Sequence, residues 1–418
     1  MFRSKRSDVL VAGAGPVGLF TTMALARHGV DVELLDTQWR TAGRSYALAL
    51  HPSTLDLLEE LGLASDLVAA GHRVDTVAFY DGDQRAGELR LGELDRAYPF
   101  VLVLPQNILE HALEEGLKKR KVKVRWNHRL ARLTPEGDHV AADVERLGKD
   151  SSGYALAETG WVVEKTMHRQ AGLVIGADGH RSHVRQLLGI DFEQVGEPEL
   201  FAVFEFTVSG EAYHEVRVVL HEDTASVLWP VREGRYRWSF QLPGPVEDEI
   251  PRIKSRFSIQ VGEQPYPFVR EENLEQFIAQ RAPWFAGRVE KIRWSLAVQF
   301  ERRLATAFGR DRTWLVGDAT HVTGPVGVQS MNVGMSEAAE LAELAAGIVG
   351  GGSPESLAAY GTRCRDQWRD LLGLGRGVAA DPEAADWARR WSDSIVPLIP
   401  AAGDDLEVLL GQIGLKLG

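Results

Sequence analysis

A glycine-rich turn near the start of the chain has the residue types and the spacing that bind dinucleotide phosphates. It follows the apolar run 9–12 and precedes an apolar, helix-like segment that ends at His28. In such a turn the first glycine permits the tight bend, the second lets the backbone approach a pyrophosphate, and the third lets the helix pack on the strand. The free N–H groups at the start of the helix then attract the phosphates. The predicted cofactor-binding residues of this turn are Gly13, Ala14, Gly15, Pro16, Val17 and Gly18.

An acidic residue completes this unit. The apolar run 32–35 reads as a second buried strand, and Asp36 follows it directly. A carboxylate at this point can accept hydrogen bonds from the adenosine ribose of a dinucleotide. Because the strand, the turn, the helix and the acid agree, we interpret the segment as a dinucleotide-binding unit. The alternative is a glycine-rich turn that binds nothing.

Two further motifs follow apolar strands later in the chain. Asp178-Gly179 follows the run 173–175, and Gly317-Asp318 follows the run 313–316. Ligands of open parallel sheets bind beyond the carboxyl ends of the strands, so we expect all three sites to converge on one extended ligand. Either Asp-Gly pair taken alone is more often only a turn.

The third motif leads into a long helix. Residues 324–327 read Gly-Pro-Val-Gly, and the apolar, alanine-rich pattern predicts a helix over about 330–349. The N-terminus of that helix would direct partial positive charge at whatever lies before it, which suits an anionic ring system.

Histidine and tryptophan side chains offer weaker evidence. Trp229 and Trp238 lie on neighbouring expected strands and could line an aromatic substrate pocket, although core packing explains them equally well. Four histidines could act as catalytic bases, but ordinary hydrogen-bonded histidines explain them better, so the catalytic residue stays unassigned. These histidines are His51, His214, His221 and His321.

The composition excludes several classes of partner. The formal net charge of −12 over 418 residues argues against nucleic acid and anionic membranes. Cys364 is the single cysteine, and no Cys/His cluster has zinc-ligand spacing, so we expect neither a disulfide nor a metal. The uncharged run 9–26 resembles a signal peptide, but cleavage after Ala26 would destroy the dinucleotide unit. We therefore expect a cytoplasmic protein without a membrane span.

The order of the patterns predicts an α/β protein in which a nucleotide-binding domain is assembled from separated pieces. We assign residues 1–73, 105–190 and 296–375 to that Rossmann-like domain. The inserted, aromatic-rich β-sheet domain takes 74–104 and 191–295, and 376–418 forms a helical tail that could serve as a homodimer interface. Locally, we expect a Ser/Gly-rich turn at 148–153 and a helix at 250–260.

Together the three motifs resemble the class A flavin-dependent monooxygenases, the family of FAD-dependent aromatic hydroxylases. That family has an N-terminal FAD fingerprint, a middle Asp-Gly motif and a late Gly-Asp motif. The fingerprint is matched by Gly13, Gly15, Gly18 and Asp36. The middle motif is matched by Asp178, Gly179, Ser182 and Arg185. The late motif is matched by Gly317, Asp318, His321, Pro325, Gly327, Asn332 and Gly334.

The resemblance implies a role for each matched site. Asp36 would contact the adenosine ribose of FAD and Asp318 the ribityl chain. Asp178 and Arg185 would support the pyrophosphate region and the passage of NADPH or NADH, which needs no separate nicotinamide fold in this family. The remaining members of the implied cofactor site are Arg44, Gln106, Pro325, Gly327 and Asn332.

The implied chemistry is that of an aromatic hydroxylase. NAD(P)H would reduce FAD, O2 would be captured as a flavin C4a-hydroperoxide, and one oxygen atom would pass to an aromatic small molecule, phenolic or polycyclic. The organic reaction belongs to the cofactor, while the protein supplies orientation and a dry site.

The sequence departs from the family after the late proline. The family usually has Gly-Gly-Gln-Gly, whereas this chain has Gly327-Val328-Gln329-Ser330. The two lost glycines add side chains where the backbone should pass close to the isoalloxazine ring. We still expect FAD binding, because Pro325, Gly327 and the following helix are retained.

Two alternatives stay open at this point. The same fold could act as a flavin reductase or as a Baeyer–Villiger-type oxygenase. Alternatively, Val328 and Ser330 could mark an accessory or binding protein that has lost the flavin. Hydrolase and NTPase functions have no support, because the chain has neither a Gly-x-Ser-x-Gly elbow nor a phosphate loop ending in Gly-Lys.

Overall fold

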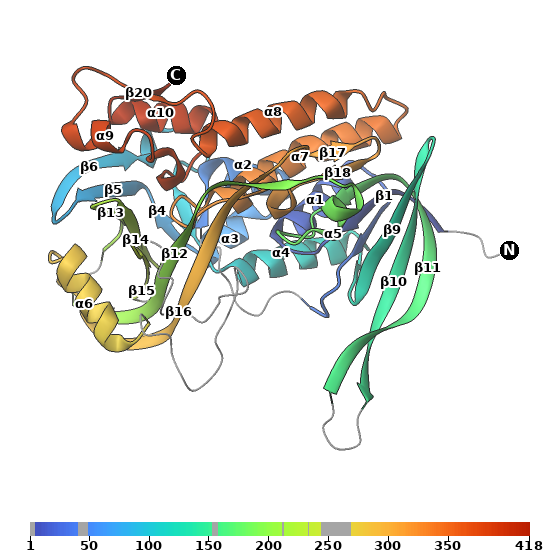
Figure 1. Ribbon diagram of the computed structural model, residues 1–418, viewed down its shortest axis with the longest axis horizontal. Helices are drawn as coiled ribbons and strands as arrows, with labels where there is room; N and C mark the ends of the chain where they lie inside the picture. Colours follow the sequence, from blue (N-terminus) through green and yellow to red (C-terminus); the bar gives the residue numbers. More distant parts are fainter. Residues whose placement is uncertain (1–4, 41–48, 153–157, 211–212, 233, 244–268) are drawn as a thin grey trace.

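The computed structural model describes residues 5–40, 49–152, 158–210, 213–232, 234–243 and 269–418 (Figure 1). Within these residues the strands form two sheets of eight strands, together with one three-stranded and one two-stranded sheet. Arg44 and the helix predicted at 250–260 lie outside the described residues.

The first sheet has a parallel centre formed by the strands that carry the three motifs. β1 lies between β2 and β11, β18 lies beyond β11, and β8 lies beyond β2. Runs of Val, Leu and Ile without polar alternation fold this way because both faces of a parallel sheet are covered. The strands are β1 Lys5–Ala12, β2 Val32–Leu35, β8 Val124–Arg125, β9 His128–Glu136, β10 His139–Ser152, β11 Glu158–Gly176, β17 Gly309–Arg310 and β18 Thr313–Leu315.

Alternate residues of β1 enter two different cores. Val9 and Val11 pack in the large core shared with the helices α1 (Pro16–Arg27), α4 (Gln106–Lys119) and α7 (Gln329–Val349). On the other face, Leu10 and Ala12 pack in a smaller core with residues of β9, β10 and α5 (His183–Leu187). The central strand is thus enclosed on both sides, which fixes the position of the loop at its end.

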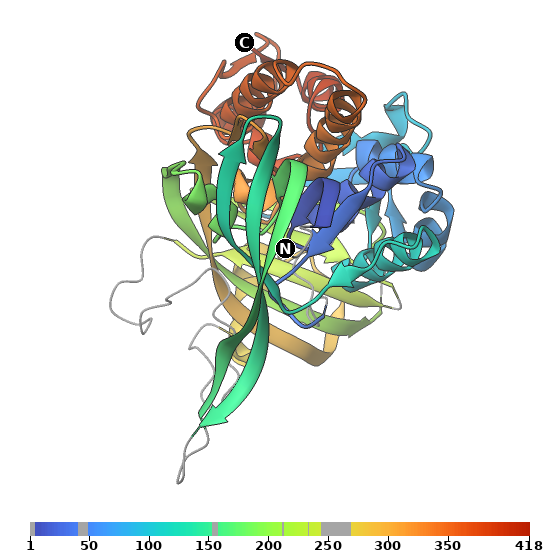
Figure 2. The same ribbon diagram turned by 90° about the vertical axis from the view of Figure 1, so that its right-hand side faces the viewer.

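β9, β10 and β11 form an antiparallel arm that extends away from the body of the molecule (Figures 1 and 2). The turn predicted at 148–153 is wrong, because residues 148–152 pair with residues 158–162 of β11. Strand pairing here satisfies the backbone hydrogen-bonding groups, and this outweighs the local turn preference of Gly and Ser.

The second sheet is the β-rich segment recognised in the sequence. Its order is β19-β16-β12-β15-β14-β13-β5-β6, so the strands β5 and β6 join strands that follow much later in the chain. One face contributes to the large core, and the other is covered by α6 (Glu271–Arg281), as Figure 1 shows. The strands are β5 Thr76–Asp81, β6 Gln84–Arg90, β12 Phe192–Ser209, β13 Val216–His221, β14 Thr224–Pro230, β15 Arg235–Gln241, β16 Arg288–Ala305 and β19 His321–Val322.

The remaining elements connect the sheets and form the tail. The C-terminal tail is only partly helical, because two of its segments pair as strands. The helices are α2 Pro52–Glu60, α3 Ala64–Ala70, α8 Ser356–Leu371, α9 Asp386–Trp391 and α10 Asp404–Gln412, with single turns η1 Leu91–Glu93, η2 Gly317–Ala319 and η3 Val396–Leu398. The short strands are β3 Ala49–Leu50, β4 His72–Val74, β7 Val101–Val103, β20 Val378–Ala380 and β21 Leu415–Leu417.

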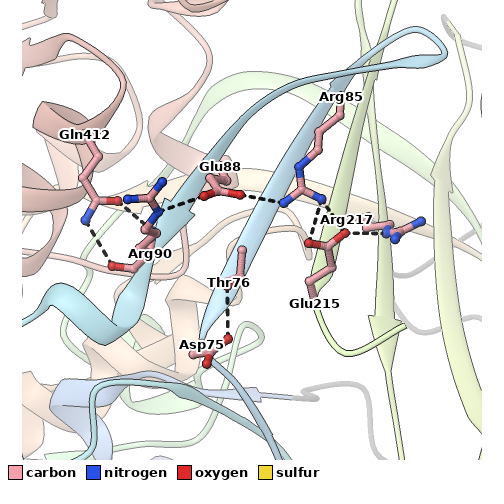
Figure 3. Close-up of polar contacts among 8 residues, drawn as sticks. All are labelled: Asp75, Thr76, Arg85, Glu88, Arg90, Glu215, Arg217 and Gln412. Carbon is pink, nitrogen blue, oxygen red and sulfur yellow. Dashed lines mark hydrogen bonds and ion pairs between the residues drawn. The ribbon is translucent and has the colours of Figure 1, made fainter. Parts of the chain in front are cut away.

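The tail packs onto the outer edge of the second sheet. The side chain of Gln412 accepts a hydrogen bond from N of Arg90 at 2.7 Å and donates to O of Arg90 at 3.1 Å, so it covers part of the β6 edge (Figure 3). The ring of Trp387 stacks on Phe79 with 5.2 Å between centroids. Figure 3 also shows a row of alternating charges that begins on β6, with Arg90, Glu88 and Arg85, and continues across the sheet to Glu215 and Arg217 at β13.

Candidate functional site

The three glycines of the first motif have two different roles in the structure. Gly13 has φ +106°, and a Cβ there would lie 2.2 Å from O of Ala177. A Cβ on Gly18 would lie 1.9 Å from O of Gly13, so both glycines are required by packing. A Cβ on Gly15, in contrast, would have no atom of the described residues within 4 Å. Gly15 therefore faces open space at the start of α1, where a pyrophosphate would sit.

The start of α1 fits an anionic group. The helix begins at Pro16, which has no N–H to leave unpaired, and no described side chain caps the N-terminus. The free N–H groups and the helix dipole therefore point toward the space in front of Gly15. This cradle fits the phosphates of FAD.

Asp36 lies beside this turn, as the strand order requires. β2 is the direct parallel neighbour of β1, so the residues that follow the two strands meet at one edge. The Oδ2 atom of Asp36 accepts a hydrogen bond from N of Ala14 at 2.6 Å, and Oδ1 accepts one from N of Gln38 at 2.6 Å. The carboxylate is partly exposed at the edge of this turn.

The middle motif is organised by Asp178. Its carboxylate accepts hydrogen bonds from Oγ of Ser182 at 2.5 Å, N of His183 at 2.7 Å and N of Val184 at 3.0 Å. Burial raises the pKa of the Asp178 carboxyl, and these hydrogen bonds oppose that rise. Asp178 thus holds the N-terminus of α5 in place beside the glycine turn.

Arg185 connects the middle motif to the late motif. Its guanidinium donates to O of Ala319 at 2.8 Å and to O of His180 at 2.8 Å, and it lies 3.9 Å from the ring centre of Phe192. The side chain is buried, and this desolvation lowers the pKa of Arg185. Its visible role is to join two strand ends from inside the protein.

The late motif closes the site from the third side. Gly317 has φ +65°, and a Cβ there would lie 3.1 Å from both methyl carbons of Val17. A Cβ on Gly334 would lie 2.9 Å from Cα of Gly317, so α7 also packs tightly on this motif. Asp318 follows in η2 and is partly exposed. The three motifs therefore converge, as the sequence predicted.

The loop before α7 contains a strained residue. Val328 has φ +51° and ψ +37°, the left-handed conformation that a β-branched residue rarely adopts. Such a residue costs on the order of 1–3 kcal/mol and persists only where the surroundings impose it. This position, where the family usually has glycine, thus keeps the backbone conformation of glycine.

Asn332 and His51 impose that conformation. Nδ2 of Asn332 donates to O of Val328 at 2.7 Å and to O of Ala49 at 3.0 Å, while Oδ1 accepts from N of His51 at 2.8 Å. Nε2 of His51 donates to O of Gly327 at 2.8 Å, and burial lowers the pKa of the His51 imidazole to about 4. His51 is therefore a neutral, hydrogen-bonded histidine.

The tail holds the same loop from the opposite side. A Cβ on Gly327 would lie 2.6 Å from O of Pro397 and 2.7 Å from O of Ile399. N of Gly327 donates to O of Pro397 at 3.1 Å, and Nε2 of Gln329 donates to O of Val396 at 2.9 Å. No feature of the sequence pointed to this contact between the tail and the loop at 324–328 that precedes α7, called the cofactor loop below.

Three other predicted site residues lie on α4 and on the second sheet. Gln106 begins α4, and its side chain donates to Oε1 of Glu110 at 2.7 Å. The prediction that Trp229 and Trp238 line one pocket is wrong. Trp229 pairs with Arg237 in the sheet register, so Trp238, the next residue, points to the opposite face. Trp238 is fully buried in the aromatic core beneath α6, where its ring stacks on Phe240.

A buried ion pair on the second sheet was missed. Nη2 of Arg237 lies 2.8 Å from Oε2 of Glu205, and both side chains are nearly buried. The register places Trp229, Arg237, Glu205 and Trp294 in one row on the face that contributes to the large core. The signal in the sequence was a charged residue at an inward position of an otherwise apolar strand.

The described residues contain neither a group of metal ligands nor a helix that could cross a membrane. Among the described residues, no group of three or more His, Cys, Asp and Glu side chains could hold a metal ion. In the same part of the chain, every helix is too short or too polar to cross a bilayer.

Comparisons with known proteins agree with this geometry. The profile of the family described as "FAD binding domain" matches residues 6–373. The chain is 31% identical over 356 residues to 6-methylpretetramide 4-monooxygenase of Streptomyces rimosus, a match that takes in 84% of this chain. It spans 57% of the length of that relative.

Solved structures show the same fold. The crystal structure of p-nitrophenol 4-monooxygenase PnpA from Pseudomonas putida DLL-E4 has a TM-score of 0.70 at 23% identity, over 98% of this chain and 97% of that one. The flavin-dependent monooxygenase PieE, in complex with FAD and substrate, has a TM-score of 0.69 at 19% identity, over 97% of this chain and 68% of that one. The chain therefore belongs to the FAD-binding family of class A flavin-dependent monooxygenases.

Proposed function

We propose that the protein is an FAD-dependent monooxygenase that uses NAD(P)H and O2 to hydroxylate an aromatic small molecule, phenolic or polycyclic. The observation that carries the proposal is the convergence of the three motifs. The turn at Gly13 packs on Ala177, and Val17 packs on Gly317, so one extended cofactor can reach all three strand ends. The relatives 6-methylpretetramide 4-monooxygenase, pentachlorophenol 4-monooxygenase and para-nitrophenol 4-monooxygenase support the same class.

In this proposal the protein's own residues bind and orient FAD. The N-terminus of α1 and Gly15 receive the pyrophosphate, Asp36 accepts hydrogen bonds from the adenosine ribose, and Asp318 contacts the ribityl chain. The loop held by Asn332 and His51 and the N-terminus of α7 face the ring system. Bound FAD supplies the redox chemistry, taking electrons from NAD(P)H and activating O2.

We place the aromatic substrate on the core-facing side of the second sheet. That face carries Phe201, Trp229 and the Arg237–Glu205 pair, so it offers aromatic rings for stacking and charged groups for polar recognition. The guanidinium of Arg237 also lies 4.9 Å from the ring centre of Trp294. Under this proposal, the strands in 74–104 and 191–295 form the substrate domain.

The experiment is a titration with FAD followed by turnover. We expect the purified protein to bind FAD, to oxidise NADPH or NADH faster in the presence of phenols, and to give a product heavier by one oxygen atom. Omitting O2 should abolish the product, and retention of the carbon skeleton distinguishes hydroxylation from ring insertion. Stimulated NAD(P)H oxidation with no oxygenated product from any aromatic compound would reject the proposal in favour of a reductase.

The flavin-less alternative is tested in the same titration. Val328 already adopts the glycine-like conformation, so its side chain leaves the backbone path of the loop unchanged. We therefore expect the wild-type protein to bind FAD without the Val328→Gly and Ser330→Gly substitutions. Binding of FAD only by the doubly substituted protein would favour an accessory role.

A further inference from the structure

A cavity of about 230 Å³ lies between the second sheet, the cofactor loop and the tail. Its walls include Gly324 and Val326 of the loop that leads into α7, so the cavity and the proposed flavin site share this loop. An apolar cavity of about 150 Å³ is enough to bind benzene, so this one can hold a single substituted aromatic ring. Its other principal lining residues are Glu199, Phe201, Arg302 and Trp391.

Glu199 is the unusual residue of this cavity. Its carboxylate lies against the backbone of the loop, because a Cβ on Gly324 would be 2.6 Å from Oε2 of Glu199. Among the described residues, no hydrogen-bond donor and no ion-pair partner lies within bonding distance of this carboxylate. Glu199 is partly exposed and lines the cavity, so a ligand bound there can donate a hydrogen bond to its carboxylate in place of water.

Burial makes the Glu199 carboxylate a stronger proton acceptor than an exposed carboxylate. Burial raises the pKa of the Glu199 carboxyl, and the positive charge of Arg302 opposes the rise without forming a contact. The Nη2 atom of Arg302 is instead engaged with O of Leu372 at 2.6 Å. The other charged residues that line the cavity are Glu222, Asp223, Arg390 and Asp393.

We propose that Glu199 accepts a hydrogen bond from the hydroxyl group of a single-ring phenol in this cavity and takes its proton as the ring reacts. This inference rests on the proposed monooxygenase function. The O–H bond of the phenol breaks, the proton moves to a carboxylate oxygen of Glu199, and the electron pair stays on the phenol oxygen. The ring becomes more electron-rich, which favours attack on an electrophilic oxygen. Arg302 balances the charge, and Phe201 supplies an apolar wall.

The first test measures binding, without turnover. Phenol and its methyl ether, anisole, are compared by equilibrium dialysis against the oxidised, FAD-loaded protein without reductant. We expect wild-type protein to prefer phenol by about tenfold, the worth of one hydrogen bond to a charged group. The Glu199→Leu variant should lose this preference. Glu197→Gln is the matched control, because Glu197 lies on the same strand, is exposed and should bind like wild type.

The second test measures the rate with a phenol that wild-type protein hydroxylates. Glu199→Gln keeps a hydrogen-bond acceptor but cannot take the proton, so kcat should fall about 100-fold while KM changes little. The acid limb of the pH profile should disappear with it. Glu199→Asp, which retains a carboxylate, should keep the acid limb and serves as the second variant if Glu199→Gln fails to bind FAD.

The outcomes separate this inference from the proposed function. A wild-type kcat in Glu199→Gln, or a phenol preference that survives in Glu199→Leu, overturns the role of Glu199 even if the enzyme is a monooxygenase. Conversely, a phenol preference that depends on Glu199, in a protein that oxygenates no aromatic compound, supports the phenol site and rejects the monooxygenase function.

Discussion

Two turns of this molecule precede long helices and face the same proposed cofactor, yet they are held in shape in different ways. The turn at 13–18 is shaped by its own glycines, because Gly13 and Gly18 leave no room for a side chain. The loop at 325–330 has a valine in a left-handed conformation. Its shape is imposed by Asn332 in the first turn of α7, which donates to Val328 and is itself bonded to the distant Ala49 and His51. His51 and the tail hold Gly327 from other parts of the chain.

The difference shows that the turn before a helix can be shaped by its own glycines or by contacts with other segments of the chain. A glycine tolerates positive φ without strain, so a motif built on glycine needs few supporting contacts. When the glycine is absent, the strain must be offset by hydrogen bonds from residues far away in the chain. The first turn should therefore be sensitive to single methyl groups, and the second to the loss of its distant partners.

The substitution with the largest expected effect on stability and FAD binding is at the first turn, residues 13–18. Gly13→Ala places a methyl group 2.2 Å from a backbone oxygen at a positive φ, where neither partner can move easily. We expect a loss of about 3–5 kcal/mol in the free energy of unfolding, together with loss of FAD binding. Urea unfolding and FAD titration measure the two effects.

Gly15→Ala is the matched control for that change. Its new methyl group meets no atom within 4 Å in the part of the chain that the structure describes, and φ is −74°, so stability should be retained. Because the methyl group enters the proposed pyrophosphate position, FAD affinity should still fall by at least about tenfold. Equal losses of stability in both variants would show that the two glycines do not differ in role.

The second largest expected effect is that the stability contributed by His51, which holds the loop before α7, depends on pH. The His51 imidazole has a pKa of about 4 in the folded protein against 6.5 when exposed, so the unfolded chain binds a proton that the native protein does not. Stability from this group is complete above pH 6.5 and is lost as the pH falls toward 4, by about 3 kcal/mol in total. Urea unfolding of the wild-type protein and of His51→Gln across this range measures it.

The comparison between these two proteins isolates the histidine from all other titrating groups. We expect the stability difference between wild type and His51→Gln to narrow as the pH falls. A difference that stays constant with pH would mean that His51 is not buried and neutral, and that the loop has other support.

The smallest effect is expected at Val328. Val328→Gly relieves the left-handed strain, but glycine also adds flexibility to the unfolded chain, so the net gain in stability should be only about 1 kcal/mol. Thermal unfolding with and without FAD measures the gain. A loss of stability on this substitution would show that the valine side chain contributes packing that exceeds its strain.

Much of the fold could be predicted from the sequence, because its signals are short-range. The apolar runs that became β1, β2, β11 and β18 lack polar alternation, and each ends at a glycine or an aspartate with a specific task. The sequence pattern also predicted the helix that became α7 and a β-sheet in the aromatic-rich segment, where β12 to β15 lie. The predicted turn at 148–153 failed because strand pairing overrode local composition.

The sequence by itself determined which residues follow the buried strands, and thereby that three motifs would meet at one edge and bind a dinucleotide cofactor. Only the tertiary structure decided that Trp229 and Trp238 point to opposite faces and that the tail holds the loop at Gly327. It also decided that Glu199 lines a cavity with no partner among the residues that the structure describes. The physical reason is the distance along the chain over which each effect acts. Glycine geometry and apolar patterning act over a few residues, whereas register, strain and burial of charge depend on contacts between segments far apart in the chain.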